Sequence, residues 1–246
     1  MISATTMKGI REINEDSIMI ANVLNGRMDV EIIHEDVSEK FSYNSVFPDD
    51  TSIFIIADGM GGLNSGEKAS YLTISQFLEK IEEEFQKNVD LEIALINAII
   101  NTSKSVKKNA PINSGSTIVG AMLLPKSLVA FNVGDSKCYV KTGSGIFISK
   151  DHSYKNMLND LDVSESVDNN IVTDYIGMDS DPDVRIYSFE HRYPLILCSD
   201  GLDILTKNGI DSSLFNRCAE ELCNAAINAG SEDNVSVIVY DGLTNL

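Results

Sequence analysis

Carboxylate side chains stand at the ends of five apolar, strand-like runs of this sequence. Three of these runs end almost directly in an aspartate, and the other two follow acidic residues. Because a layered sheet protein can bring the ends of its strands together at one rim, these side chains could all meet there. The six residues concerned are Glu15, Asp16, Asp58, Asp135, Asp200 and Asp233.

Carboxylates gathered at one rim predict a site for divalent cations. Like charges a few ångströms apart raise each other's pKa, so the group could not all stay ionised without a cation. Oxygen ligands without His or Cys select Mg²⁺ or Mn²⁺ and give no indication of zinc. Each member taken alone has a structural alternative, since Asp-Gly after a strand is most often a turn and an acidic pair before a strand is most often a solvated end. Five strand ends of one kind favour the metal site.

The hydrophobic pattern predicts the elements that would carry these residues. Helices are expected at 64–87, 90–108 and 211–229, with a short helical turn near 154–160. The stretch 114–150 reads as a four-strand antiparallel meander. Helices segregated from runs of antiparallel strands indicate an α+β sandwich, with helices outside and sheets inside. Strands are expected at 17–23, 30–34, 52–57, 116–124, 127–134, 137–141, 145–149, 184–189, 194–198 and 235–240.

Length, composition and charge limit the classes of protein that the chain could represent. Its 246 residues show no repeat, linker or break in composition, so we expect a single domain over 1–246. A net charge of −18 makes nucleic acid a poor partner. We expect a cytoplasmic protein without a membrane partner, because no apolar run could span a bilayer and the N-terminus lacks the pattern of a signal peptide. The four cysteines have no zinc-like spacing and are expected to be reduced structural residues.

Seven short motifs occur in order along the chain and span residues 11–234. Each is weak alone, but "DGMGG" with the downstream "SDG" and "DN" is specific. The series resembles the metal-dependent serine/threonine protein phosphatases of the 2C type (the PPM family), in their compact bacterial form. The motifs are "RxxNED" at 11–16, "ADGMGGxxxGExAS" at 57–70, "GST" at 115–117, "VGDS" at 133–136, "DHS" at 151–153, "CSDGL" at 198–202 and "EDN" at 232–234.

The resemblance implies a four-layer αββα sandwich with a binuclear Mn²⁺ or Mg²⁺ centre at one end of the paired sheets. In that pattern Asp58 bridges both ions, and the carbonyl group of Gly59 ligates the second ion. The other roles that it implies are Asp200 and Asp233 on the first ion, Glu15 and Asp16 on the second directly or through water, and Asp135 on a third ion shared with Asp200. Arg11 matches the phosphate-binding arginine, so we expect Arg11, Asp16 and Asp58 to be the catalytic residues.

The activity that the resemblance implies is hydrolysis of phosphoserine and phosphothreonine on proteins, within a kinase-linked signalling system. Two cations about 3.5–4 Å apart can lower the pKa of a bridging water, so that hydroxide forms near neutral pH and attacks the phosphoryl group. Arg11 would hold two phosphate oxygens in a bidentate fork, which a lysine could not reproduce. Glycines 59, 61 and 62 would let the backbone turn so that a carbonyl group faces a metal. Met60 stands where many animal and plant members have His, so metal-bound water is expected to protonate the leaving alcohol.

Two segments depart from the compact pattern. Residues 24–50 are interpreted as a solvated insertion, with a β-hairpin extension or a partner surface as alternatives. Residues 153–180 correspond to the flap beside the active site and are expected to influence substrate choice. His152, the one histidine in a motif, is expected to be structural.

The alternative function from another class is a pseudophosphatase, a regulatory binding module that has lost catalysis. Such proteins typically lack metal ligands, whereas every expected carboxylate is present here. We therefore favour the enzyme, acting as a monomer on phosphorylated proteins. Whether it serves one phosphorylated regulator or many substrates is left open.

Overall fold

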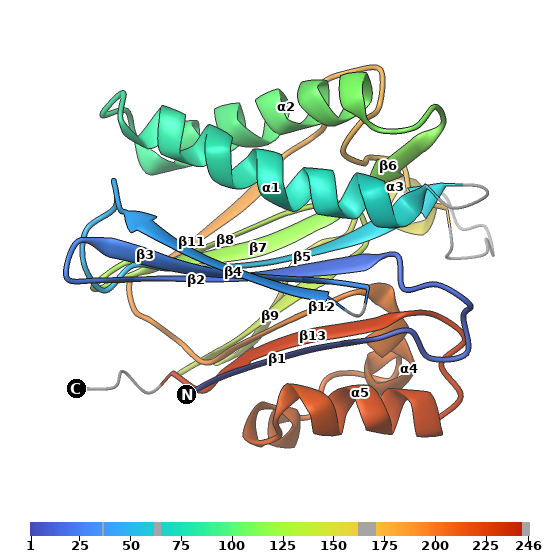
Figure 1. Ribbon diagram of the computed structural model, residues 1–246. Helices are drawn as coiled ribbons and strands as arrows, with labels where there is room; N and C mark the ends of the chain where they lie inside the picture. Colours follow the sequence, from blue (N-terminus) through green and yellow to red (C-terminus); the bar gives the residue numbers. More distant parts are fainter. Residues whose placement is uncertain (36, 62–64, 162–170, 243–246) are drawn as a thin grey trace.

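Two antiparallel β-sheets lie face to face, and helices cover both outer sides of the pair (Figure 1). This computed structural model describes residues 1–35, 37–61, 65–161 and 171–242. The first sheet has eight strands, in the order β11-β8-β7-β5-β2-β3-β4 with β6 beside β5, and the second has five, in the order β1-β13-β12-β9-β10. The four-layer αββα sandwich is confirmed.

The elements follow one another along the chain as sheet-forming strands interrupted by helical segments. The strands are β1 (Ile2–Met7), β2 (Asp16–Leu24), β3 (Arg27–His34), β4 (Val37–Asn44), β5 (Ser52–Gly61), β6 (Ser114–Ser116), β7 (Ile118–Leu123), β8 (Leu128–Val133), β9 (Lys137–Thr142), β10 (Gly145–Ile148), β11 (Arg185–Phe189), β12 (Leu195–Cys198) and β13 (Val235–Tyr240). The helices are α1 (Gly66–Phe85), α2 (Leu91–Asn109), α3 (Tyr154–Asp160), η1 (Asp200–Leu202), α4 (Asp203–Thr206), η2 (Ser212–Asn216) and α5 (Ala219–Asn228).

The central strand β5 is apolar on both faces because both faces are buried. Ile53 and Ile55 pack into the core beneath α1 and α2. Phe54 and Ile56 alternate with them and pack into the core between the two sheets. A third core lies between the five-stranded sheet and α5. The period-2 alternation therefore predicts the face of every later residue on the strand, and Asp58 falls on the face between the sheets.

The helical spacing of apolar residues accounts for the outer layers. Helix α1 buries one stripe, which includes Ile74, Phe77 and Ile81, against the eight-stranded sheet. Helix α2 begins after Asp90, the expected N-cap, whose side chain accepts a hydrogen bond from the backbone N–H of Glu92 at 2.9 Å. No helix within the described ranges is long and apolar enough to cross a bilayer.

The predicted four-strand meander over 114–150 is wrong. Strands β7 and β8 belong to the eight-stranded sheet, whereas β9 and β10 belong to the five-stranded sheet. The chain passes from one sheet to the other at Gly134, which has a φ of +104° that favours glycine. The sequence pattern predicts two successive strands, but it does not distinguish a turn within one sheet from a crossing between two sheets.

The predicted helix at 211–229 is also wrong in its extent. The segment divides into η2 and α5, with residues 217 and 218 between them in extended conformation. Cys218 therefore caps α5, and its backbone N–H donates to the side chain of Glu221 at 3.2 Å. The four cysteines are free, as expected, with Cys218 exposed and the others buried.

Three strands were missing from the sequence prediction: β1, β4 and β6. Strands β3 and β4 occupy most of the segment 24–50 as a hairpin at the edge of the eight-stranded sheet. The structure therefore agrees with the β-hairpin extension that the sequence left as an alternative to a solvated insertion. Of the flap-like segment 153–180, residues 162–170 lie outside the described ranges, and the rest includes α3.

Candidate active site

Asp16 and Asp58 face each other across two neighbouring strands at the rim of the sandwich. The two residues are direct cross-strand partners in the register of β2 with β5. Ile18 and Ile56, the next pair on the same face, belong to the core between the sheets. Like charges directly opposite each other destabilise a sheet. The pair is therefore costly unless a proton or a cation lies between its members.

The side chain of Asp16 is buried and anchored by the other sheet. Its Oδ2 accepts hydrogen bonds from the hydroxyl groups of Ser199 at 2.9 Å and Ser236 at 2.6 Å. Its Oδ1 is buried and has no hydrogen-bond partner among the described residues. Burial raises the pKa of Asp16 to about 6 against the opposing effect of the two serines. One oxygen is thus fixed by protein donors, and the other is left for a ligand.

Asp58, Asp135 and Asp200 show the electrostatic signature of carboxylates held close together. Burial, and then the charges of Asp16 and Asp200, raises the pKa of Asp58 well above its ordinary value. Burial, and then the charge of Asp135, raises the pKa of Asp200 to about 8. Burial also raises the pKa of Asp135. Asp200 Oδ1 is a second buried oxygen without a hydrogen-bond partner among the described residues.

Glu15 joins the end of β5 to the start of α1. Its Oε1 accepts a hydrogen bond from the backbone N–H of Gly66 at 3.1 Å, and its carbonyl group accepts one from the N–H of Gly59 at 3.1 Å. A Cβ atom on Gly59 would lie 2.0 Å from the carbonyl oxygen of Gly66. Gly59 is therefore required by close backbone approach, whereas Gly62 lies outside the described residues. Burial raises the pKa of Glu15, partly offset by the hydrogen bond from Gly66.

Arg11 lies beside the last of the expected ligands, Asp233. Its Nη2 is 2.7 Å from Asp233 Oδ2, and its Nε donates to the carbonyl oxygen of Glu232 at 3.0 Å. The Arg11 side chain is half exposed. A guanidinium group has five N–H donors, so three remain for a ligand. All seven predicted site residues, together with Gly59, therefore lie at one end of the sandwich, connected by hydrogen bonds, strand pairing or mutual electrostatic effects.

The sequence motifs included residues whose positioning roles only the structure reveals. Thr117 Oγ1 accepts from the backbone N–H of Asp58 at 3.1 Å and shares a 2.8 Å hydrogen bond with the hydroxyl group of Ser136. Asn234 Oδ1 accepts from the N–H of Glu15 at 2.9 Å, while its amide group donates to two carbonyl groups of the loop before β2. These polar residues hold the loops that carry the carboxylates.

The contacts of His152 are consistent with its expected structural role. The backbone N–H of Gly134 donates to His152 Nδ1 at 3.1 Å, which leaves Nε2 to donate to Asp183 Oδ2 at 3.2 Å. Burial, followed by the charge of Arg185, lowers the pKa of the ring. The imidazole group thus fixes the loop after β10 against the turn before β9.

The donor set suits hard divalent cations. All the side-chain ligands expected from the sequence are carboxylates, and two of their oxygens are buried without a hydrogen-bond partner in the described part of the chain. Within the described ranges, no three His, Cys, Asp or Glu side chains form a ready-made coordination shell. The mutual raising of the pKa values nevertheless places the carboxylates within electrostatic reach of one another. A cation between them would remove the repulsion that raises those values.

The sequence profile of the family described as protein phosphatase 2C matches residues 40–237. The serine/threonine phosphatase Stp of Listeria welshimeri is 25% identical over 215 residues, which cover 78% of this chain and 85% of that relative.

Solved structures show the same fold. A point variant of a bacterial serine phosphatase has a TM-score of 0.69 at 25% identity, and the match covers 99% of this chain and 98% of that one. The catalytic domain of the serine/threonine protein phosphatase PstP, solved with two manganese ions, has a TM-score of 0.63 at 20% identity, with 97% and 96% covered. The chain therefore belongs to the protein phosphatase 2C family of metal-dependent protein phosphatases.

Proposed function

We propose that this protein hydrolyses phosphoserine and phosphothreonine in other proteins at a centre of two Mn²⁺ or Mg²⁺ ions. The single observation that carries the proposal is the pairing of Asp16 with Asp58 at the rim, with the unpartnered oxygens of Asp16 and Asp200 beside them. Manganese bound to the structural relative PstP supports the choice of metal.

The assignment of ligands follows the roles that the family resemblance implies. Asp58 would contact both ions, Asp200 and Asp233 the first, and Glu15, Asp16 and the carbonyl group of Gly59 the second. Asp135 would share a third ion with Asp200. When bound, the ions would supply an activated water nucleophile and offset the charge that develops on the phosphoryl group.

Arg11 would bind and orient the phosphate group. Its guanidinium is held by Asp233 and by the carbonyl of Glu232, so its plane is fixed before substrate arrives. The donors that remain can form two parallel hydrogen bonds to phosphate oxygens. Such preorganisation lowers the entropy lost when the substrate is positioned for attack.

The first experiment measures phosphate release from a phosphothreonine peptide with Mn²⁺ and with EDTA. Asp58→Asn and Asp200→Asn should each lower kcat/KM more than about 100-fold, since even the outer partners of metal ligands typically contribute 10–100-fold. Asp29→Asn, which changes an exposed aspartate on β3, is the matched control and should retain wild-type activity. Full turnover in EDTA would refute the proposal.

Calorimetric titration with Mn²⁺ distinguishes the proposed enzyme from a pseudophosphatase. The proposed enzyme binds the ion and hydrolyses the peptide, whereas a regulatory module that has lost its metal site would do neither.

We further propose that residues 1–246 act as one catalytic domain, as a cytoplasmic monomer, opposite a Ser/Thr kinase.

A further inference from the structure

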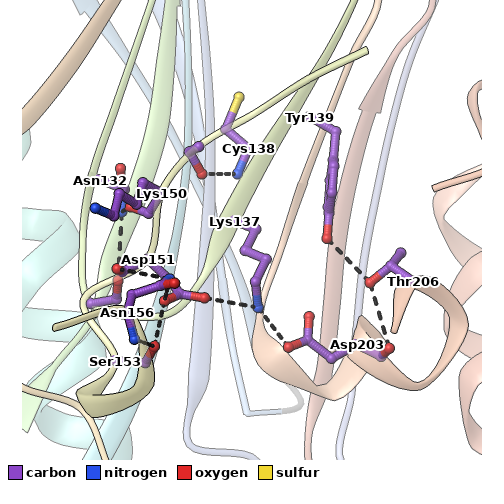
Figure 2. Close-up of polar contacts among 12 residues, drawn as sticks. Asn132, Lys137, Cys138, Tyr139, Lys150, Asp151, Ser153, Asn156, Asp203 and Thr206 are labelled. Atoms are coloured by element: carbon purple, nitrogen blue, oxygen red, sulfur yellow. Dashed lines mark hydrogen bonds and ion pairs between the residues drawn. The ribbon is translucent and has the colours of Figure 1, made fainter. Parts of the chain in front are cut away.

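A partly buried lysine joins three segments around the candidate metal centre. Lys137 is the first residue of β9, and its side chain is 15% exposed. Its Nζ lies 2.5 Å from Asp203 Oδ2 and 3.7 Å from Asp151 Oδ2. Both contacts are drawn as dashed lines in Figure 2. One ammonium group therefore connects β9, the turn after β12 and the loop before α3.

The first of these contacts acts on the turn that carries Asp200. Asp203 begins α4 directly after η1, which contains Asp200. Asp203 Oδ1 is buried and without a hydrogen-bond partner among the described residues, so the Lys137 contact is the ion pair on which this carboxylate depends. The negative charge of Asp203 contributes to the raised pKa values of both Asp200 and Asp135. Without the ammonium group, repulsion among these aspartates would move the turn.

The second contact acts on the N-terminus of α3. Asp151 Oδ1 accepts a hydrogen bond from Ser153 Oγ at 2.7 Å and another from the amide group of Asn156 (Figure 2). Ser153 is the N-cap of α3 and accepts from the N–H of Asn156 at 3.3 Å. The Asp151 carboxylate thus contacts both the N-cap residue and the first turn of α3.

A cavity of about 210 Å³ lies between these two segments. Asp135 and Asp200 line it together with the residues that Lys137 connects. The Lys137 ammonium group forms one ion pair with Asp203 on one side of the cavity and one with Asp151 on the other side, so the distance across the cavity depends on both contacts. Loss of Lys137 would leave both carboxylates without their cation, and the cost is larger for Asp151, whose side chain is 16% exposed, than for the more exposed Asp203.

We infer that Lys137 is a positioning residue of the active site, which holds the turn bearing Asp200 at a fixed place relative to Asp135 and the start of α3. The inference rests on the proposed function only in taking Asp135 and Asp200 as metal ligands. It assigns to Lys137 an effect on metal affinity without direct contact with the metal.

The test is calorimetric titration of the full chain with Mn²⁺. Lys137→Met keeps most of the apolar stem of the side chain and removes its charge, and it should weaken Mn²⁺ binding by about 10-fold or more, the range typical of outer partners of metal ligands. Lys137→Arg should restore most of the affinity, because it retains the cation. Lys141→Met is the matched control: Lys141 lies on the same strand, over the ring of Phe215, and its loss should leave binding unchanged.

A second variant separates positioning from folding. Asp203→Asn removes the charge of a side chain that is 43% exposed and leaves Lys137 beside Asp151, so the protein should fold. The double variant Lys137→Met/Asp203→Asn should lose no more affinity than Lys137→Met alone, because Asp203→Asn breaks a contact that Lys137→Met has already removed. Thermal melting in EDTA verifies that every variant is folded.

Each outcome decides one question. Equal Mn²⁺ affinity in wild type, Lys137→Met and Asp203→Asn would overturn the role of Lys137 and leave the proposed function intact. Weaker binding in Lys137→Met, with rescue by Lys137→Arg, would support that role even if the wild-type protein hydrolysed no phosphopeptide, a result that would overturn the proposed function alone.

Discussion

Replacing Asp16 by Asn should stabilise the metal-free protein, although the same change should abolish activity. Asn has the shape of a protonated Asp16, and its carbonyl oxygen can still accept from Ser199 and Ser236. Its amide group would face the carboxylate of Asp58, the cross-strand partner, and could donate to it. The substitution thus removes a buried negative charge and keeps the packing.

The magnitude follows from the raised pKa of Asp16. A rise from 3.8 to about 6 corresponds to about 3 kcal/mol, at about 1.4 kcal/mol for each pKa unit. Between these two values the folded protein binds more protons than the unfolded chain, so stability falls as the pH rises. Below pH 3.8 both states are protonated and the penalty is absent, whereas above pH 6 it is complete. Asp16→Asn should therefore gain about 3 kcal/mol at pH 8 and almost nothing at pH 4.

The assay is urea unfolding in EDTA at pH values from 4 to 8. Asp29→Asn, an exposed change on β3, is the control and should shift the free energy of unfolding by less than about 0.5 kcal/mol. Mn²⁺ at about 1,000 times the wild-type Kd should reverse the order, since wild type gains about 4.1 kcal/mol there and the variant loses a ligand. Two results would refute the electrostatic account of the site. In one, Asp16→Asn is less stable than wild type in EDTA; in the other, its gain in stability is the same at every pH.

Three further outcomes follow from the contacts. Gly59→Ala should lower the free energy of unfolding by about 3 kcal/mol because its Cβ would overlap a carbonyl group, whereas Gly143→Ala, which has open space around it, should change little in thermal melting. Arg11→Lys should raise KM for a phosphopeptide about 10-fold through loss of the bidentate fork, and an unchanged KM would exclude Arg11 from phosphate binding. Ser199→Ala should weaken Mn²⁺ binding about 10-fold by freeing Asp16, as calorimetry would reveal.

The strand ends could be predicted from sequence because two local signals coincide there. In β5 an apolar run ends in Asp58, and period 2 assigns this residue to the face between the sheets. The same reasoning locates the side chain of Asp16 once β2 is recognised. The pairing of these two residues required the register, which depends on strands distant in the sequence.

The errors in the fold prediction arose where local pattern is ambiguous. The turn at Gly134 leads from one sheet to the other, yet its residues would also serve a hairpin. Strand β1 has only partly buried residues and a mixed sequence, so its structure derives from pairing with β13 rather than from its own hydrophobicity. The apolar residues around Phe215 continue a helical spacing, although the chain is extended at 217 and 218.

The anchoring of Asp16 explains why part of the site was invisible in the sequence. Asp16 lies on the eight-stranded sheet, whereas its two donors, Ser199 and Ser236, come from the end of β12 and from β13 in the other sheet. Serines beside apolar strands are common, and nothing local indicates that these two meet a carboxylate from a distant strand. A buried, charged group that accepts from both donors favours one alignment of the sheets over others. The carboxylates proposed to bind metal therefore also help to set how the two sheets meet, and a change at Ser199 or Ser236 should alter metal affinity and sheet packing together.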